Sequence, residues 1–382
     1  MGCAAWNFGY APRERSRLFG AVRRWKLAVF RASSRHLPGR NGSGQWLGNV
    51  EVGPAVKAFR SVAPGRVCLF GEHQDYLGWP VVAGAIDLAC QIRFTPTGNA
   101  PLRIHLPDID GKAEWPNFPS SRPYPYLSAA LGKEHLEGWS ALVQSALPQR
   151  AGASSSTALV TSWTAGIHRA RTSGTLAPEA LADAAHFAEV RAHGEPGGRM
   201  DHLAIAHGGL HRFHFDGQQP EPISIPDAAC LLIDTLQPKP TLHVLSQAAA
   251  QRKKWVADPA SAQSHSDRKL LEATHRNREV CWEGTEALIQ GDLWAVGKAM
   301  TAHHAFLRDH LQVSTSGIES VLTAALKAGA YGGKLNGSGG GGTVVVLAPH
   351  SAVLAIESAV RAVHCVPYCV QLGAPGAHIV EE

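Results

Sequence analysis

The stretch APGRVCLFGEHQDYLG, residues 63–78, decides the fold of this chain. Within it, residues 67–70 would place apolar side chains on both faces of an extended chain, so we expect a strand that is buried on both sides. Ionisable side chains flank that strand: Arg66, Glu72, His73 and Asp75. Such a cluster is typical of an ion-paired strand end, but it can also line a pocket where a buried strand ends.

A second informative stretch is PQRAGASSSTA, residues 148–158, which an apolar run follows. Small residues let the backbone approach an anion closely, and the first N–H groups of a following helix are unpaired and carry partial positive charge. A single serine here would indicate an ordinary helix cap. Three successive serines beside Gly152 and Thr157 instead favour a phosphate cradle that is made of backbone groups.

The third stretch is GGKLNGSGGGGT, residues 332–343, which precedes a β-branched run. Gly337, Gly339 and Gly342 match the dinucleotide-binding pattern G-x-G-x-x-G in form. In that pattern the glycines follow a strand and open a helix, whereas here they precede a strand. The match is therefore weak evidence for a dinucleotide site.

These three stretches, in this order, resemble the three motifs of the GHMP kinases, a family named for galactokinase, homoserine kinase, mevalonate kinase and phosphomevalonate kinase. The resemblance extends from about residue 58 to the C-terminus. It implies an α+β fold with two lobes and an active site between them. We expect an N-terminal lobe at residues 51–217 and a C-terminal lobe at residues 218–382.

Hydrophobic periodicity and turn residues predict the secondary structure within these lobes. We expect strands at residues 52–59, 66–70, 81–89, 102–105, 139–146, 210–215, 229–234, 334–336 and 343–347. We expect helices at residues 155–171, 178–193, 200–207, 243–251, 266–289, 292–309 and 317–328.

The resemblance also implies ATP and Mg²⁺ as cofactors. The residues to which it assigns ATP binding are Gly152, Ala153, Ser154, Ser155, Ser156, Thr157, Gly337 and Gly339, and the first six of these would cradle the phosphates. It assigns Mg²⁺ to Ser156 and Glu189, whose oxygen atoms suit a hard cation. Glu189 is predicted near the C-terminal end of a helix, where the helix dipole disfavours a carboxylate. A bound cation nearby would explain a carboxylate at this place. The alternative is that Glu189 simply lies on a solvated face of the helix.

Asp201 follows Glu189 by twelve positions, as the catalytic aspartate does in galactokinases. By resemblance, Asp201 would take the proton of the acceptor hydroxyl, and Arg66 would keep Asp201 ionised and stabilise the charge of the transferring group. The residues that would bind the hydroxyl groups of the acceptor are Glu72, His73, Asp75 and Tyr76.

The acceptor itself is less well defined by the sequence. Arg66 and the pattern GEHQDY at residues 71–76 look like galactokinase, whereas LFGEH at residues 69–73 and GGL at residues 208–210 look like mevalonate kinase. Galactokinases usually carry Asn where Cys68 stands and Thr where Gln74 stands. We favour a galactokinase-like sugar 1-kinase, with mevalonate kinase as the first alternative and a non-catalytic galactose- and ATP-binding sensor as the second.

Composition limits the other function classes. The chain has 382 residues and no run of 18 apolar residues, so we expect no membrane-spanning helix. Its seven cysteines lack C-x-x-C spacing, which indicates a reduced, cytoplasmic protein. We expect a small-molecule sugar or polyol as the partner, with neither nucleic acid nor membrane; the oligomeric state stays open.

The basic character of the chain is concentrated at its start. Residues 1–50 hold nine of the 36 Lys and Arg residues and one of the 31 acidic residues, so the rest of the chain is slightly acidic. This argues against nucleic-acid binding by the main body. We expect residues 1–50 to be a disordered leader, either a segment that resembles a mitochondrial transit peptide or the product of a misassigned start site.

Overall fold

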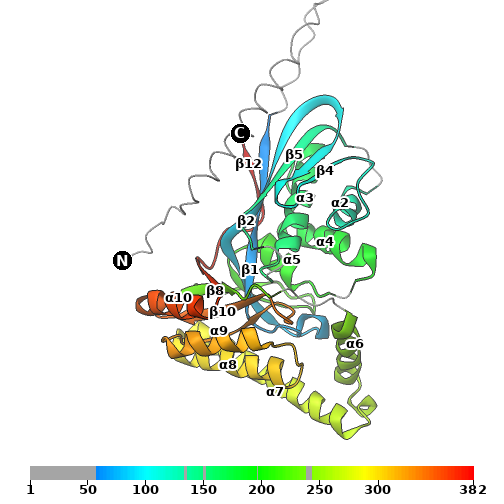
Figure 1. Ribbon diagram of the computed structural model, residues 1–382. Coiled ribbons are helices and arrows are strands. Elements are labelled where there is room, and N and C mark those ends of the chain that lie inside the picture. Colours follow the sequence, from blue (N-terminus) through cyan, green and yellow to red (C-terminus); the bar gives the residue numbers. More distant parts are fainter. Residues whose placement is uncertain (1–56, 133–135, 149–151, 196, 238–242) are drawn as a thin grey trace, which may run out of the picture. The chain divides into compact units, whose positions relative to one another are not determined.

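The computed structural model describes residues 57–132, 136–148, 152–195, 197–237 and 243–382, with only the helical backbone for residues 243–248. The predicted leader, residues 1–50, lies outside the described residues. Val56–Glu382 forms one unit. Within it, two sheets and their covering helices follow one another along the chain (Figure 1).

Strand β1 (Phe59–Phe70) runs through the centre of this unit, and all of its residues from Ala63 onward are buried. The expected burial of residues 67–70 is thereby confirmed. The sequence predicted two strands, at residues 52–59 and 66–70, but β1 continues through Pro64 and Gly65. An irregularity in its pairing with β2 (Val81–Pro101) lies between these two residues, so the ladder accommodates the proline without ending the strand.

The first sheet has the strand order β12-β1-β2-β5-β3-β4, and β6 and β7 attach to it through β2. Helices α3, α4 and α5 pack against one another, and α3 and α5 contact β1 and β2. The other elements of this part are β3 (Arg103–Leu106), β4 (Gly111–Glu114), α2 (Tyr124–Leu131), β5 (Glu137–Ser145), α3 (Ser155–Thr172), α4 (Pro178–Glu189), α5 (Met200–His207), β6 (Leu210–Phe213) and β7 (Glu221–Pro222).

The second sheet has the order β11-β8-β10-β9, with antiparallel neighbours throughout. Helices α8, α9 and α10 contact its strands, and α7 packs on α8 (Figure 1). The elements are β8 (Ala229–Asp234), α6 (His243–Ala257), α7 (His265–Gln290), α8 (Leu293–Asp309), α9 (Ser316–Lys327), β9 (Gly332–Asn336), β10 (Thr343–Ala348), α10 (Val353–Ala362) and β11 (Val366–Val370).

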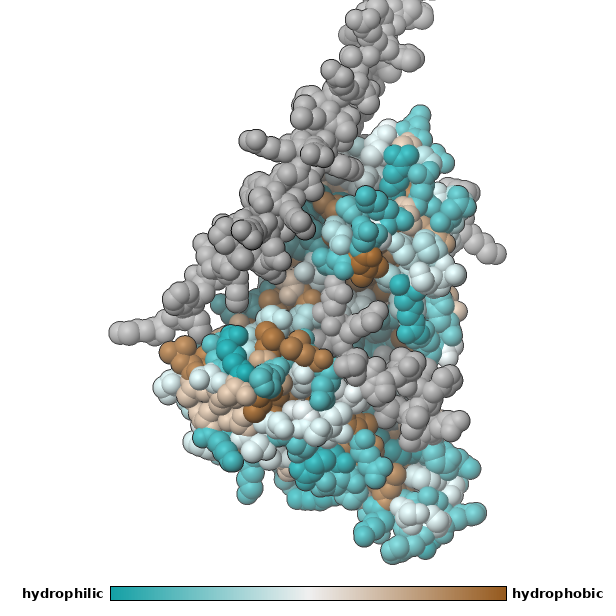
Figure 2. Space-filling view, viewed as in Figure 1, coloured by the Kyte–Doolittle hydropathy of each residue, from teal (hydrophilic) through white to brown (hydrophobic). Residues whose placement is uncertain are grey.

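The last strand, β12 (His378–Glu381), returns to the first sheet and pairs with β1. The C-terminal end of the chain therefore belongs to the N-terminal sheet, and the division into lobes at residues 217 and 218 stays a prediction. None of the described helices is both long and apolar enough to cross a membrane. Figure 2 shows one face of the molecule, on which hydrophobic residues form small separate patches among hydrophilic ones.

The α+β fold is confirmed, and the expected elements differ from the observed ones mainly in length. Strand β2 reaches Pro101, well beyond the predicted end at residue 89. The elements that the sequence did not predict are β4, β7, α2, α10, β11 and β12. Strands β11 and β12 are short, and each pairs with a strand far away in the sequence, so local patterns carry little information about them.

Candidate active site

Strand β1 and helix α5 bring Arg66 and Asp201 into direct contact. The Arg66 guanidinium donates two hydrogen bonds to the carboxylate, from Nε to Oδ1 and from Nη2 to Oδ2, both at 2.8 Å. Its third bond runs from Nη1 to the carbonyl oxygen of Gly152 at 2.6 Å. Arg66 is 3% exposed and the Asp201 side chain is 28% exposed, so the guanidinium is buried while the carboxylate stays accessible from one side. One arginine thus joins the predicted base to the predicted phosphate cradle.

Asp201 is held as a carboxylate by its neighbours. Burial alone would raise its pKa, but the charge and hydrogen bonds of Arg66 outweigh burial, and Ser154 adds a further bond, so the pKa is lowered. The Ser154 hydroxyl donates to Asp201 Oδ2 at 2.6 Å. An ionised carboxylate at this place can accept a hydrogen bond, and then the proton, from an alcohol.

The predicted cradle lies at the start of α3. Ser154 precedes the helix with φ 57°, and its side chain makes no capping bond to the helix because its hydroxyl is directed to Asp201. The carbonyl oxygen of Gly152 accepts from Asn336 Nδ2 at 3.1 Å as well as from Arg66. These contacts fix the segment that leads into α3. The Ser154 side chain does not cap the first N–H groups of α3. These groups can therefore donate to an anion at the start of the helix.

The glycine turn between β9 and β10 lies against the first motif. Gly337 N donates to Glu72 Oε1 at 3.3 Å, so its amide is already engaged within the protein. Gly339 has φ 80°, and a Cβ placed there would lie 2.5 Å from the carbonyl oxygen of Val313. A side chain at position 339 would therefore clash with backbone. The roles of Gly337 and Gly339 in ATP binding stay predictions.

Residues 71–78, called the acceptor loop below, follow β1 and contain the short 3₁₀ turn Asp75–Leu77. Asp75 Oδ1 accepts from the backbone N–H of Tyr76 at 2.9 Å, and Oδ2 accepts from that of Met200 at 3.4 Å. Because Met200 precedes Asp201, two carboxylates lie close together at the start of α5. Burial, and then the charge of Asp201, raise the pKa of Asp75 to about 6.

His73 and Tyr76 lie beside each other in this loop. Burial and the nearby charge of Arg252 lower the pKa of His73 to about 4, so the imidazole is neutral at pH 7. Its Nε2 donates to the carbonyl oxygen of Ser338 at 3.2 Å, and its Nδ1 can accept from the Tyr76 hydroxyl at 3.5 Å. Arg252 Nη1 donates to that hydroxyl at 2.9 Å. The sequence analysis did not single out Arg252.

Glu72 points into a buried cluster. Its Oε1 forms an ion pair with Lys334, and its Oε2 lies 3.4 Å from His303 Nε2. Burial would raise the pKa of Glu72, but opposing effects, of which the positive charge of Lys334 is the largest, lower it to about 2. These contacts favour a role in joining β1 to β9, and acceptor binding by Glu72 stays a prediction. The sequence signal that could have indicated a buried partner was Lys334, a charged residue within the short predicted strand at residues 334–336.

Glu189, the last residue of α4, lies beside helix α5. Its Oε2 is 2.9 Å from Nε2 of His202, the residue after Asp201. Ser156 is exposed in the first turn of α3, and no direct contact joins it to Glu189 among the described residues. Within the same part of the chain, no group of three or more His, Cys, Asp and Glu side chains is arranged to hold a metal ion. The assignment of Mg²⁺ to Ser156 and Glu189 stays a prediction.

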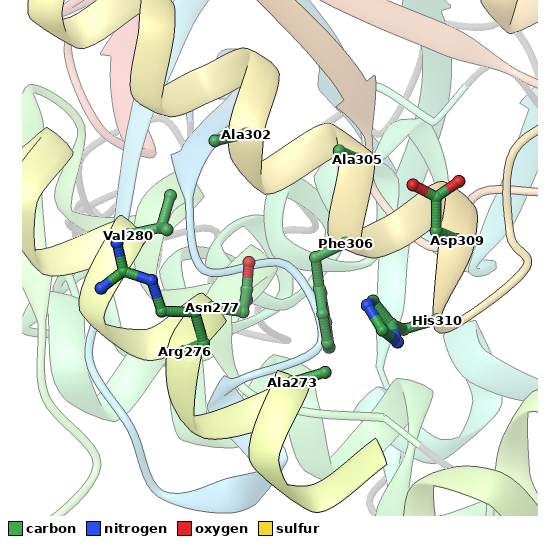
Figure 3. A pocket seen from close by; sticks show the side chains of 9 residues that line it. All are labelled: Ala273, Arg276, Asn277, Val280, Ala302, Ala305, Phe306, Asp309 and His310. Carbon is green, nitrogen blue, oxygen red and sulfur yellow. The ribbon is translucent and has the colours of Figure 1, made fainter. Parts of the chain in front are cut away.

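A groove of about 220 Å³ between α7 and α8 contains none of these residues (Figure 3). Phe306 and Ala305 of α8 face Ala273 and Asn277 of α7 across it. The groove is therefore separate from the cluster around Arg66 and Asp201, and we base the candidate active site on that cluster.

Three family descriptions match successive parts of the chain. They are the galactokinase galactose-binding signature at residues 52–96, the GHMP kinases N terminal domain at residues 124–209 and the GHMP kinases C terminal at residues 285–364. The first covers the acceptor loop, and the second covers the cradle, Glu189 and Asp201.

Similar proteins agree with these matches. A galactokinase of Bos taurus is 30% identical over 334 residues, covering 76% of this chain and 83% of that protein. A mevalonate kinase of Thermococcus sibiricus is 26% identical over 306 residues, covering 75% of this chain and 88% of that protein. The crystal structure of Lactococcus lactis galactokinase complexed with galactose superposes with a TM-score of 0.75 at 19% identity, covering 86% of this chain and 96% of that one. The ordered motifs, the fold and these relatives together show that the chain belongs to the GHMP kinase family, as a kinase of the galactokinase-like kind.

Proposed function

We propose that this protein is a galactokinase-like sugar 1-kinase, which transfers the γ-phosphoryl group of ATP to the anomeric hydroxyl group of a hexose. The observation that supports this best is the bidentate pair of the buried Arg66 and the partly exposed Asp201, which lies between the acceptor loop and the start of α3. Such a pair supplies a carboxylate for the acceptor hydroxyl and a cation beside the transferring phosphoryl group.

The residues have distinct tasks in this proposal. Asp201 takes the proton of the acceptor hydroxyl while that oxygen bonds to the γ-phosphorus and the bond to the ADP oxygen breaks. Arg66 keeps Asp201 ionised and correctly oriented through two hydrogen bonds. His73, Asp75 and Tyr76 bind hydroxyl groups of the sugar, because buried hydroxyls need partners.

Gly152 and residues 153–157 would lie against the ATP phosphates. Glu189 and Ser156 offer oxygen ligands of the kind that Mg²⁺ prefers, and the bond from His202 would orient the Glu189 carboxylate. When bound, Mg²⁺ neutralises charge on the phosphate oxygens. The predicted cytoplasmic location is part of this proposal.

The experiment is ATP turnover by the full chain with a panel of hexoses and with mevalonate. Phosphorus NMR of the product identifies the hydroxyl that is phosphorylated. We expect turnover with a hexose and a phosphate on its C1 oxygen. Turnover with mevalonate alone would establish the mevalonate kinase alternative. The similarity to the mevalonate kinase of Thermococcus sibiricus is the reason to test it. Nucleotide and galactose binding without turnover would establish the sensor alternative, against which the presence of Asp201 and of the serine-rich cradle argues.

A further inference from the structure

Arg252 of α6 lies against the acceptor loop. Its Nη1 donates to the Tyr76 hydroxyl at 2.9 Å, and its Nη2 donates to the carbonyl oxygen of His73 at 3.5 Å. The two loop residues are separated from Arg252 by more than 170 positions in the sequence. Helix α6 also packs against the 3₁₀ turn Asp75–Leu77. Arg252 is therefore the polar link between α6 and the loop.

His73 and Tyr76 stand on either side of Asp75 in the sequence. Arg252 contacts both of them, so it fixes both ends of the short segment that carries Asp75. Within the loop, the backbone bonds are short-range ones, such as Gln74 N–H to the Gly71 carbonyl at 3.0 Å. Such local bonds define the turn. Contacts with other elements hold the turn in place, and these include the bonds of Arg252, the bond of His73 to Ser338 and the bond of Met200 to Asp75.

The Arg252 side chain is buried without an acidic partner. It is 2% exposed, and no carboxylate of the described residues lies within ion-pair distance. Its Nε finds no hydrogen-bond partner within the described part of the chain. The guanidinium lies 5.9 Å from the ring centre of Tyr76 and 5.6 Å from that of Phe306, and these aromatic contacts offset only part of the cost of burying a cation.

We propose that Arg252 is a positioning residue for the acceptor loop, and that the chain retains it at the expense of folding stability. Burying a guanidinium without a carboxylate beside it costs desolvation energy that its two hydrogen bonds offset only in part. This inference rests on the proposed function, since it takes residues 73–76 to be the acceptor-binding segment. Arg252 acts through Tyr76 and His73 and is not itself a catalytic residue.

The first test compares steady-state kinetics and thermal unfolding of the full chain with Arg252→Met, Tyr76→Phe and the double variant. Lys253→Met is the control, because it removes an exposed positive charge at the next position of α6. We expect Arg252→Met to raise the acceptor KM about ten- to hundredfold, the scale of losing a charged hydrogen bond. The ATP KM should stay unchanged.

Tyr76→Phe removes the hydroxyl that Arg252 holds. If Arg252 acts through this hydroxyl, the double variant should raise the acceptor KM much less than the product of the two single effects. The unfolding midpoint of Arg252→Met should equal or exceed that of Lys253→Met. An unchanged acceptor KM, or fully additive effects on it, would overturn the positioning role. A midpoint clearly below that of the control would overturn the stability part.

A second measurement does not depend on turnover. Hydrogen exchange at the amides of residues 74–78 should become faster in Arg252→Met and stay unchanged in Lys253→Met. Equal protection in the two variants would contradict the positioning role. If the wild type turns over no acceptor, the proposed function fails, and the exchange result still decides whether Arg252 holds the loop.

Discussion

Lys334 and Glu72 form a buried ion pair that joins the third sequence motif to the first. Lys334 is fully buried and Glu72 is 1% exposed. The Lys334 ammonium also donates to the carbonyl oxygens of Cys68 at 3.0 Å and of Leu335 at 2.7 Å. Its three donors therefore all have partners, and they hold β1, the acceptor loop and β9 together.

Breaking this pair from one side should destabilise the fold. Lys334→Met leaves the Glu72 carboxylate buried without its cation, so we expect the free energy of unfolding to fall by about 3–5 kcal/mol. The double variant Lys334→Met/Glu72→Gln should recover part of that loss, because neither charge is then buried alone. Urea unfolding of the two variants measures both values. Equal losses in the single and double variants would show that the pair is not the cause.

The same pair predicts a pH dependence of stability. The pKa of Glu72 in the folded chain is lowered from 4.5 to about 2. Its stabilising contribution is therefore present above pH 4.5 and is lost as the pH falls towards 2. The stability advantage of the wild type over Glu72→Gln should shrink across this interval, as acid titration of the unfolding free energy would reveal. A constant difference would mean that Glu72 does not titrate in this way.

Asp201→Asn tests the catalytic base. An amide keeps the shape of the side chain but cannot accept the proton of the acceptor hydroxyl, so we expect kcat to fall by at least about a hundredfold. Nucleotide affinity should change little, because Asp201 reaches the cradle through the Ser154 hydroxyl, and the amide oxygen of an asparagine can still accept that hydrogen bond. Single-turnover kinetics and nucleotide titration separate the two effects. A kcat near that of the wild type would remove Asp201 from the mechanism.

Glu189→Gln tests the proposed metal ligand. A neutral amide is a poorer ligand for a hard cation, so the Mg²⁺ concentration at half-maximal activity should rise. Ser156→Ala should act in the same direction, and Glu272→Gln, a change of an exposed residue of α7, serves as the control. A Mg²⁺ titration of initial rates provides the comparison. If the Glu189→Gln curve overlays that of the wild type, Glu189 serves only to orient His202.

Asp75→Asn should raise the hexose KM about ten- to hundredfold, because a sugar hydroxyl loses the carboxylate oxygen that accepts its hydrogen bond. The same change should stabilise the protein at neutral pH. The pKa of Asp75 is raised from 3.8 to about 6, so the ionised side chain destabilises the fold increasingly as the pH rises through that interval. The stability gain of Asp75→Asn over the wild type should be full above pH 6 and should vanish below about pH 4. An unchanged hexose KM would exclude Asp75 from acceptor binding.

The sequence by itself determined the local elements that carry the site. The predicted strand at residues 229–234 coincides with β8 because a short apolar run is a local signal. The predicted helix at residues 200–207 coincides with α5, and the glycines on both sides of it are local signals too. The three motifs likewise identified the family, since each is a short stretch whose composition is unusual. Arg66 and Asp201 were expected to act together through the family resemblance, and the structure places them in contact.

Only the tertiary structure decided how the motifs are joined. Lys334 pairs with Glu72, His303 approaches the same carboxylate, and Arg252 holds Tyr76. Each of these contacts connects residues that are more than 170 positions apart, so no pattern within a short window encodes it. The side-chain directions arise when β1, β9, α6 and α8 pack against one another. Since these side chains are buried, each needs a polar partner, because an unpaired charge in the interior lowers the stability of the fold.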